Sequence, residues 1–202
     1  MTKHFFCALH QQLYEATRAL HSEIDHHSLL QPLFCASLSI SEYGDMLAAL
    51  HGFYAAAETI IEDGLNNHSL PLTYHDRRKL PAIADDLAQL QRYPWPFEQS
   101  FPRLSHSAQL IGLLYVVEGA SLGGQMIAAR LRQQQRHDLP LSFYSGSGEN
   151  VNQQWQAFLN CAASCCSTDD YETACQYARE VFTVFLKHLD AVHRLGSICL
   201  AN

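Results

Sequence analysis

Charged residues are scarce in this sequence, because Asp, Glu, Lys and Arg together make up only 16% of its 202 residues. Basic residues are the scarcer kind, with 13 Lys and Arg against 20 Asp and Glu, so the formal net charge is -7 at pH 7. Proteins that bind nucleic acid need clustered Lys and Arg to neutralise the phosphates. This balance excludes nucleic acid as the main partner and leaves an anionic small ligand open.

Membrane and targeting signals are also missing. No segment approaches the roughly 18 consecutive apolar residues of a membrane-spanning helix. The first residues, MTKHFFCALHQQ, lack the long apolar run of a signal peptide. The seven cysteines contain no pair of C-x-x-C motifs. We therefore expect a cytoplasmic protein with no membrane partner and with free, mostly buried thiols.

Apolar residues are abundant, at 48% of the chain, and they recur with the spacing of helices. No run alternates in the way that a strand does. The sequence therefore predicts an all-α fold, with residues 1–202 forming a single domain. The predicted helices cover about 5–26, 39–67, 107–136, 151–162 and 169–193, and residues 76–90 form either a helix pair or one helix from Pro81.

Two helix ends carry clear signals. Ser39 and Glu42 have the spacing of a capping box, which marks the start of the second helix. Gly64 and the two Asn residues after Leu65 are expected to end it. Loops are predicted at 91–102, where three prolines fall close together, and at 139–150.

The stretch LYEATRALHSEIDHH contains a candidate metal ligand. Asp25 follows His21 by four residues, so a helix places both side chains on one face. Asp25 can then hold one imidazole nitrogen of His21 and leave the other unprotonated, as in metal-bound histidines. The alternative is a partly buried histidine whose polarity Asp25 satisfies. A zinc site that adds His26 and His27 fits less well, because these side chains fall on other faces and resemble helix-end or surface residues.

The stretch YVVEGASLGGQMIAARL keeps helical spacing although Gly119, Gly123 and Gly124 lie within it. Each interior glycine costs a helix roughly 1 kcal/mol relative to Ala. Three interpretations are open: close approach of another helix, a kink at the paired glycines, or a flat ligand lying against exposed backbone. Together with His21, the third would sandwich a planar metal macrocycle between two helices.

These residues resemble a known family. LYEATRALH resembles the proximal helix of the haem oxygenases, and LLYVVEGASLGGQMIAARL resembles their distal helix, especially in the bacterial, biliverdin-producing branch. The segments ALHGFYAAAETIIED, LPAIADDLAQL, SFYSGSGENVNQQWQAFL and AREVFTVFLKHLD are similar to the remaining helices of that branch, in the same order. The resemblance extends over nearly the whole chain and implies the helical fold of that family.

The resemblance implies a function and roles for the candidate residues. His21 would be the axial ligand of the haem iron, with Asp25 hydrogen-bonded to it. Gly119 and Gly123 would lie over the haem, and Gly124 would help the distal helix to bend. Haem would be both substrate and cofactor, and O2 would convert it to biliverdin, free iron and carbon monoxide.

The resemblance also implies partners. No G-x-G-x-x-G follows a predicted strand, so electrons are expected from a separate ferredoxin, flavodoxin or reductase. Some bacterial members make biliverdin for a photoreceptor. The alternative functions are a haem-binding carrier or sensor on the same fold and a relative that binds a thiamine-type or quinone-type molecule.

One position departs from the family pattern. Many members have an Asp directly after the first distal glycine, where it anchors a network of water molecules, and this chain has Ala120 there. The resemblance therefore leaves the source of protons unassigned. Ser121, Glu118 and ordered water are the candidates in this sequence.

Overall fold

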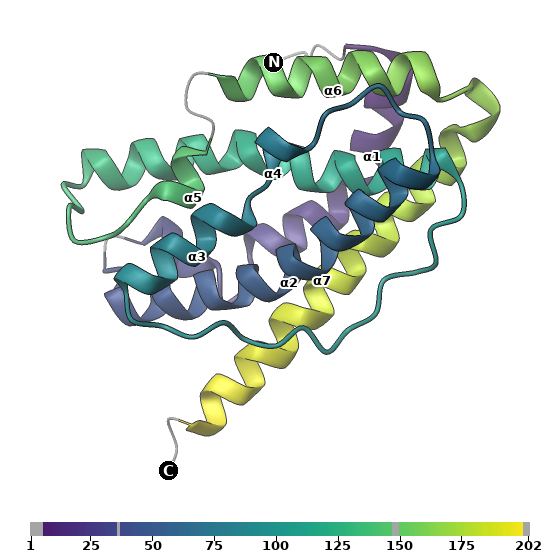
Figure 1. Ribbon diagram of the computed structural model, residues 1–202. Helices are drawn as coiled ribbons and strands as arrows, with labels where there is room; N and C mark the ends of the chain where they lie inside the picture. The colour runs from purple at the N-terminus through teal and green to yellow at the C-terminus, as the bar shows by residue number, and fades with distance from the viewer. Residues whose placement is uncertain (1–5, 36, 147–149, 200–202) are drawn as a thin grey trace.

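The computed structural model describes residues 6–35, 37–146 and 150–199, and within these ranges it contains helices and loops but no strand (Figure 1). The predicted all-α fold is therefore confirmed. In chain order the elements are α1 (Ala8–Asp25), η1 (Gln31–Phe34), α2 (Ile40–Asn67), η2 (His75–Arg77), α3 (Leu80–Gln89), α4 (Ser107–Gln133), α5 (Ser142–Ser145), α6 (Val151–Cys165), η4 (Thr168–Asp170) and α7 (Tyr171–Cys199).

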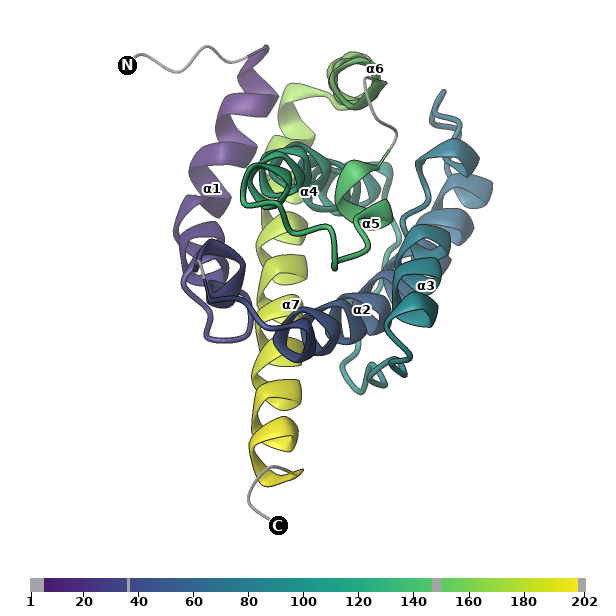
Figure 2. The ribbon, with the colours of Figure 1, turned by 90° about the vertical axis from the view of Figure 1, so that its left-hand side faces the viewer.

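Helix α4 runs through the middle of the molecule and packs against α7, α6, α5 and α2. Figure 2 shows α4 nearly end-on, between α1 on one side and α5 on the other. Its first half carries a nearly continuous run of buried apolar residues from Ala108 to Val117. Gly112 marks the crossing with α7, because a Cβ there would lie 2.4 Å from the carbonyl oxygen of Ala174.

The second helix begins as the sequence predicts. Ser39 accepts a hydrogen bond from the backbone N–H of Glu42 at 3.1 Å, and the Glu42 carboxylate accepts from the Ser39 N–H at 2.8 Å. The helix ends at Asn67, the second of the two Asn residues that were predicted to end it, whereas Gly64 lies within its last turn. Gly64 instead gives room to Leu110 of α4, whose Cδ1 would lie 2.9 Å from a Cβ at this position.

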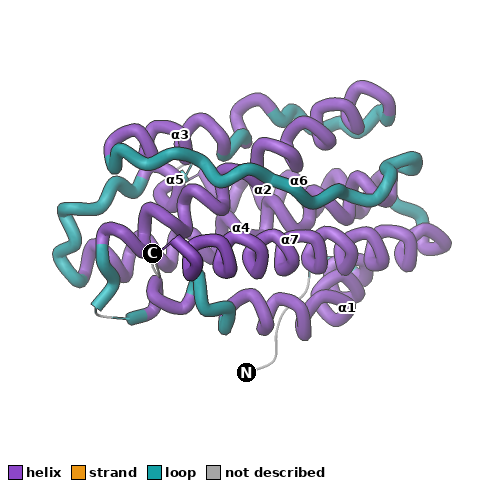
Figure 3. Tube along the Cα trace, turned by 90° about the horizontal axis from the view of Figure 1, so that it is seen from below, coloured by secondary structure: helices purple, strands orange, loops and turns teal. Residues whose placement is uncertain are grey.

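The proline-rich segment is a loop, as predicted, and it crosses the bundle as an extended strap from about 91 to 105 (Figure 3). The backbone N–H of Trp95 donates to the carbonyl oxygen of Ala48 in α2 at 3.1 Å. Tyr177 of α7 donates its hydroxyl proton to the carbonyl oxygen of Pro102 at 2.8 Å. These bonds fix the strap to α2 and α7.

Several predicted boundaries need correction. The first helix begins at Ala8, with Cys7 as its N-cap, rather than at residue 5, which lies outside the described residues. The last helix continues past 193 to Cys199. The predicted loop at 139–150 contains the short helix α5, because the Asp86 carboxylate accepts hydrogen bonds from the N–H groups of Ser142 and Phe143 at 3.0 and 2.9 Å.

Helix α4 is the one described helix that is long and apolar enough to cross a membrane, with a mean hydropathy of 1.4 over an 18-residue window. The expectation that no segment approaches such a span therefore overlooked this helix. Half of that window is buried within the protein. Its apolar character is accounted for by its place at the centre of the bundle.

Six cysteines have described side chains, and all six are free thiols. Three of them are buried, namely Cys161, Cys166 and Cys175, while Cys35 is exposed. Burial raises the pKa of each of the three buried thiols to about 11. The predicted free thiols are therefore present, and the buried ones stay protonated at neutral pH.

Candidate functional site

His21 and Asp25 form the pair that their spacing predicts. His21 Nδ1 lies 3.1 Å from Asp25 Oδ2 near the end of α1. Both side chains are well exposed, at 61% and 50%. The His21 ring also approaches the ring of Phe182 in α7, with 6.0 Å between centroids. Within the described ranges Nε2 of His21 has no protein partner, so it is free to bind a ligand.

The neighbouring histidines do not join this pair. Nδ1 of His26 lies 2.7 Å from the carbonyl oxygen of Ser22 at the end of α1, as expected of a helix-end residue. His27 directly follows the C-cap of α1 and its N–H donates to the carbonyl oxygen of Ile24, so it is a helix-end residue as expected. Its side chain is only 9% exposed, and Nε2 lies 3.3 Å from Asp190 of α7. No group of three metal-ligating side chains occurs in the part of the chain that the structure describes.

The three candidate glycines in the second half of α4 face different surroundings. A Cβ at Gly119 would meet only the ring of Trp155, at 3.8 Å, and a Cβ at Gly123 would meet nothing within 4 Å. A Cβ at Gly124 would lie 3.4 Å from the ring of Tyr144. No other backbone approaches Gly119 or Gly123 that closely. Of the three interpretations, a close helix crossing therefore does not apply to these two positions.

The second half of α4 presents an open face. Ala120, Gly123, Met126 and Arg130 are exposed along it, and Met126 is 77% exposed. The helix is continuous through the glycines, so none of them ends it. No atom of His21 lies within 4 Å of a Cβ built at Gly119 or Gly123. The structure therefore keeps the histidine and the glycines out of direct contact.

A buried ion pair anchors the middle of α4. Arg77 Nη1 donates to Glu118 Oε2 at 2.8 Å and to the carbonyl oxygen of Gln154 at 3.0 Å. The two charged side chains are only 8% and 2% exposed. Burial raises the pKa of Glu118, and the nearby Arg77 opposes that change. The second carboxylate oxygen of Glu118 has no hydrogen-bond partner among the residues described.

A second buried carboxylate lies beside it. Glu58 of α2, 1% exposed, accepts hydrogen bonds from the backbone N–H groups of Lys79 and Leu80 and from Arg78 Nε. Lys79 itself is only 5% exposed. Burial lowers the pKa of its ammonium group, while Glu118 and Glu58 act in the opposite direction.

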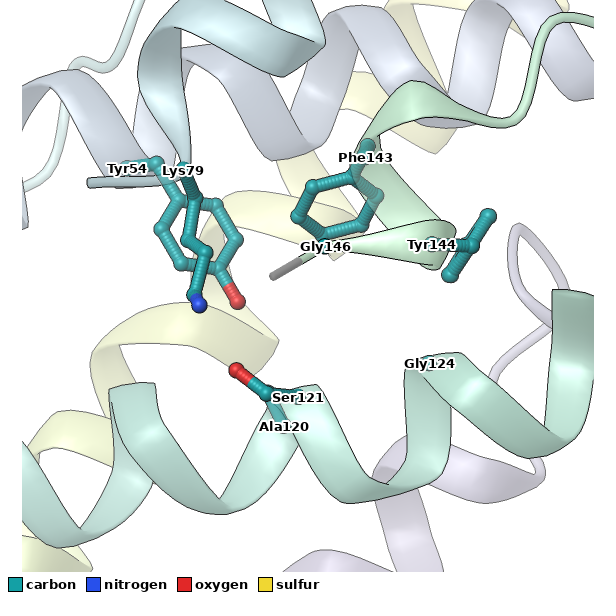
Figure 4. Close-up of a pocket in the computed structure, with 8 residues that line it drawn as sticks. All are labelled: Tyr54, Lys79, Ala120, Ser121, Gly124, Phe143, Tyr144 and Gly146. Atoms are coloured by element: carbon teal, nitrogen blue, oxygen red, sulfur yellow. The ribbon is translucent and has the colours of Figure 1, made fainter. Parts of the chain in front are cut away.

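Of these groups, Lys79 borders a small cavity of about 10 Å³ between α2, α4 and α5. Figure 4 shows Lys79 and Tyr54 pointing into it from one side and the Ser121 hydroxyl from the other. The Ser121 oxygen is buried and has no hydrogen-bond partner in the described parts of the chain. Ala120 also lines the cavity, so the cavity reaches the edge of the open face of α4.

Sequence reasoning missed Arg77 and Lys79. Both lie in the segment DRRKL, which looks like an ordinary solvated charge run. The sequence signal that could have identified them lies in two other segments. Glu58 and Glu118 interrupt apolar helix segments at positions that face the core. A buried carboxylate needs a cation or several N–H donors. These two glutamates therefore indicate that basic residues from another segment lie beside them.

A comparison with known protein families covers most of the chain. The family model described as "Heme oxygenase" matches residues 7–191. The chain belongs to the haem oxygenase family. This membership confirms the family resemblance of the sequence. The open face of α4 and the His21–Asp25 pair therefore occur in a protein whose family is named for acting on haem.

Relatives of the haem oxygenase family support this assignment. A protein named "Heme oxygenase" from Xanthomonas campestris pv. campestris is 32% identical over 108 residues, which are 53% of this chain and 63% of that protein. The chain thus matches less than two thirds of that relative's length.

Solved haem oxygenases share the fold. The structure from Neisseria meningitidis has a TM-score of 0.72 at 24% identity and covers 90% of both chains. The one from Leptospira interrogans has a TM-score of 0.73 at 18% identity, covering 91% of this chain and 98% of that one. A haem complex from Synechocystis has a TM-score of 0.69 at 15% identity, covering 97% and 99%.

Proposed function

We propose that this chain is a haem oxygenase, a single domain over residues 1–202 that converts haem to biliverdin, free iron and carbon monoxide. The observation that carries the proposal is the family match, which extends over residues 7–191. The open glycine face and the paired histidine support it independently of the match. The family match also favours turnover over the alternative of a haem carrier or sensor.

The residues present fit a bound haem. His21 offers a free Nε2 at an exposed site, and the bond to Asp25 favours the tautomer in which Nε2 carries no proton. Gly123 leaves a stretch of backbone over which nothing lies within 4 Å. We propose that His21 would bind the haem iron, that Asp25 would orient His21, and that Gly119 and Gly123 would leave room for the flat haem against α4.

Each of these residues has a physical role in the reaction. When bound, haem supplies the iron that activates O2 and the ring that is cleaved. A neutral imidazole such as His21 donates less electron density to the iron than a thiolate does. The side-chain-free backbone at Gly119 and Gly123 would restrict where a small reactant can lie between the haem and α4. Gly124, which packs against Tyr144, would help α4 to bend beside the haem.

Electrons have to be supplied by a second protein. The sequence has no dinucleotide-binding fingerprint, so we propose a ferredoxin, a flavodoxin or a reductase as the donor. Biliverdin released by this reaction would be available to a photoreceptor that binds it.

A spectroscopic titration tests the proposed function. Purified protein is titrated with haemin, and the absorption spectrum is then followed after a reductant is added in air. We expect a Soret band that saturates at one haem per chain and then decays as a biliverdin band grows. A haem spectrum that persists under these conditions would identify a carrier, and failure to bind haem would refute both functions.

Two histidine variants test the assignment of His21 as the iron ligand. His21→Ala should abolish the native haem spectrum, because it removes the only proposed axial side chain. His26→Ala is the matched control, since His26 is an exposed histidine on the neighbouring turn. An unchanged axial signal in His21→Ala, or an equal loss in His26→Ala, would contradict the assignment.

A further inference from the structure

A groove lies between the C-terminal half of α2 and the end of the strap. Side chains between Ile60 and His68 form one wall, and residues 101–105 of the strap form the other. Figure 1 shows the strap reaching this end of α2 just before α4 begins. The volume of the groove is about 500 Å³. Sites for small molecules have volumes of roughly 300–1,000 Å³, so the groove is large enough for an organic ligand.

The groove is separate from the open face of α4. Gly64, one of its lining residues, faces Leu110 in the buried half of α4. A helix rises about 1.5 Å per residue, so Leu110 and Gly119 are about 14 Å apart along the helix axis. Neither His21, Gly119 nor Gly123 lines the groove. A ligand in the groove therefore does not occupy the surface proposed for haem.

The strap wall of the groove is held in place by the protein itself. The ring of Phe101 stacks on that of Phe97, with 5.3 Å between centroids, and lies 5.6 Å from that of Phe53 in α2. The carbonyl oxygen of Pro102 accepts the hydrogen bond from Tyr177 of α7. Because this wall is fixed before a ligand arrives, binding requires little additional ordering of the chain.

The apolar part of the lining is only half covered. Ile60, Phe101 and Leu104 pack against the core of the protein and yet stay partly exposed. Single exposed apolar residues are ordinary, whereas apolar surface gathered in a groove with a polar rim is typical of a ligand site. The lining therefore favours a molecule with an apolar body.

The rim of the groove carries two charges of opposite sign. Asp63 belongs to α2 and Arg103 to the strap, and both side chains are exposed. Neither forms an ion pair within the described ranges, whereas the neighbouring Glu62 pairs with Arg78 at 3.4 Å. The two also do not pair with each other, so their charged atoms are more than 4.0 Å apart. Together they complement a molecule with an ammonium group at one end and a carboxylate at the other.

We propose that this groove binds an apolar zwitterion of about the size of a dipeptide. Its ammonium group pairs with Asp63, its carboxylate pairs with Arg103, and its apolar groups lie over Ile60 and Leu104. The half-buried side chain of His68 also lines the groove and supplies a further hydrogen-bonding group. This second ligand site does not depend on the proposed function.

Nuclear magnetic resonance of the full, haem-free chain tests the site. The dipeptide leucyl-phenylalanine is titrated into isotopically labelled protein, and the chemical shifts of the backbone amides are followed. We expect saturable shifts at residues 60–68 and 101–105 and unchanged signals at His21 and Gly123. Shifts that do not saturate, or that saturate only in other parts of the chain, would overturn the proposal.

Two analogues of the dipeptide test the role of each charge. N-acetylation removes its ammonium group and amidation removes its carboxylate. Each change should weaken binding to the unchanged protein about 2- to 5-fold, which is the scale of an exposed ion pair. Asp63→Asn should cancel the effect of acetylation alone, and Arg103→Gln should cancel the effect of amidation alone. Equal binding of all three ligands to the unchanged protein would contradict the proposal.

Matched controls change exposed charges outside the groove, namely Asp85→Asn on α3 and Arg194→Gln on α7. Both should keep the full difference between the dipeptide and its analogues, and loss of that difference in either control would count against the site. Asp63 and Arg103 are exposed, so their variants are expected to fold. Failure of the proposed function is seen separately, as absent haem binding in the unchanged protein.

Discussion

The two halves of α4 use glycine for opposite purposes. In the first half, Gly112 lets the backbone of α7 approach so closely that a Cβ would lie 2.4 Å from the carbonyl oxygen of Ala174. In the second half, a Cβ at Gly123 would meet nothing within 4 Å. The first glycine is explained by packing within the protein. The second has no such explanation, and that difference is what points to a ligand.

Glu118 lies at the boundary between the halves. It is the last residue before Gly119 and ties α4 to Arg77, which follows α2 in the chain. The buried half is thus held by apolar packing and ends in an ion pair, after which the helix opens on one side. Variants at three α4 positions and one on α7 test this difference between the two halves.

The largest effect is expected at the boundary. Glu118→Ala should lower the free energy of unfolding by about 3 kcal/mol, because it leaves the buried charge of Arg77 without its counter-ion. Urea unfolding followed by circular dichroism measures this. Glu23→Ala, at an exposed position of α1, serves as the control and should change stability little. Equal stability of the two variants would show that the pair does not anchor α4.

The next effect concerns the buried half. Gly112→Ala should cost about 1–3 kcal/mol, because the added methyl group overlaps the backbone of Ala174 and the helices have to separate. The same urea experiment applies. The sign of the stability change distinguishes the two cases, because an alanine at an unobstructed helix position would stabilise the protein instead. A more stable Gly112→Ala would mean that α4 and α7 do not cross this closely.

A smaller and opposite effect is expected in the open half. Gly123→Ala should stabilise the haem-free protein by about 1 kcal/mol, because Ala favours the helix and meets no neighbouring atom. The same methyl group should weaken haem binding or slow turnover. Ala129→Gly, at another exposed position of this half, should destabilise the protein by a similar amount and leave haem binding intact. A Gly123→Ala variant that gains stability and keeps full activity would contradict the site.

The smallest effect is a pH dependence on α7, the helix that supports the buried half. His188 is 1% exposed and Nε2 lies 2.9 Å from the carbonyl oxygen of Ala49, and burial lowers its pKa from the ordinary 6.5. Below about pH 6.5 the unfolded chain therefore binds a proton that the folded chain does not, so stability falls as pH falls.

The measurement compares urea midpoints at pH 7.5 and 5.5. His188→Gln keeps a donor for Ala49 but cannot titrate in this range, so its midpoint should change less between the two pH values. Other half-buried histidines, such as His51, still contribute to the remaining slope. An unaltered slope in His188→Gln would show that this histidine takes up its proton equally in both states.

Local signals made most of the fold predictable. The capping box of Ser39 and Glu42 and the three prolines of the strap act within a few residues, so the sequence shows them directly. Gly64 was misread because a glycine near a helix end usually terminates it, whereas here Leu110 from another helix needs the space. Helix α5 was missed because its N-terminal N–H groups are bound by Asp86, a residue more than fifty positions away.

The candidate site also has one part that the sequence predicts and one part that it does not. His21 and Asp25 are four residues apart on one helix, so their contact follows from the sequence. The cavity behind Ala120 joins Tyr54, Lys79 and Ser121 from three separate elements. The packing of α2 against α4, and of α3 against α2 and α5, brings them together, and no spacing in the sequence predicts it.

The bonds that Asp86 makes to α5 join elements that are far apart in the sequence. They fasten α5 to α3, and Tyr43 of α2 adds a bond to the carbonyl oxygen of Pro140 just before α5. The wall of the cavity opposite Ser121 is therefore built by α2, α5 and the residue that precedes α3. Because Ser121 belongs to α4, the width of the cavity is set by how far α4 lies from these elements.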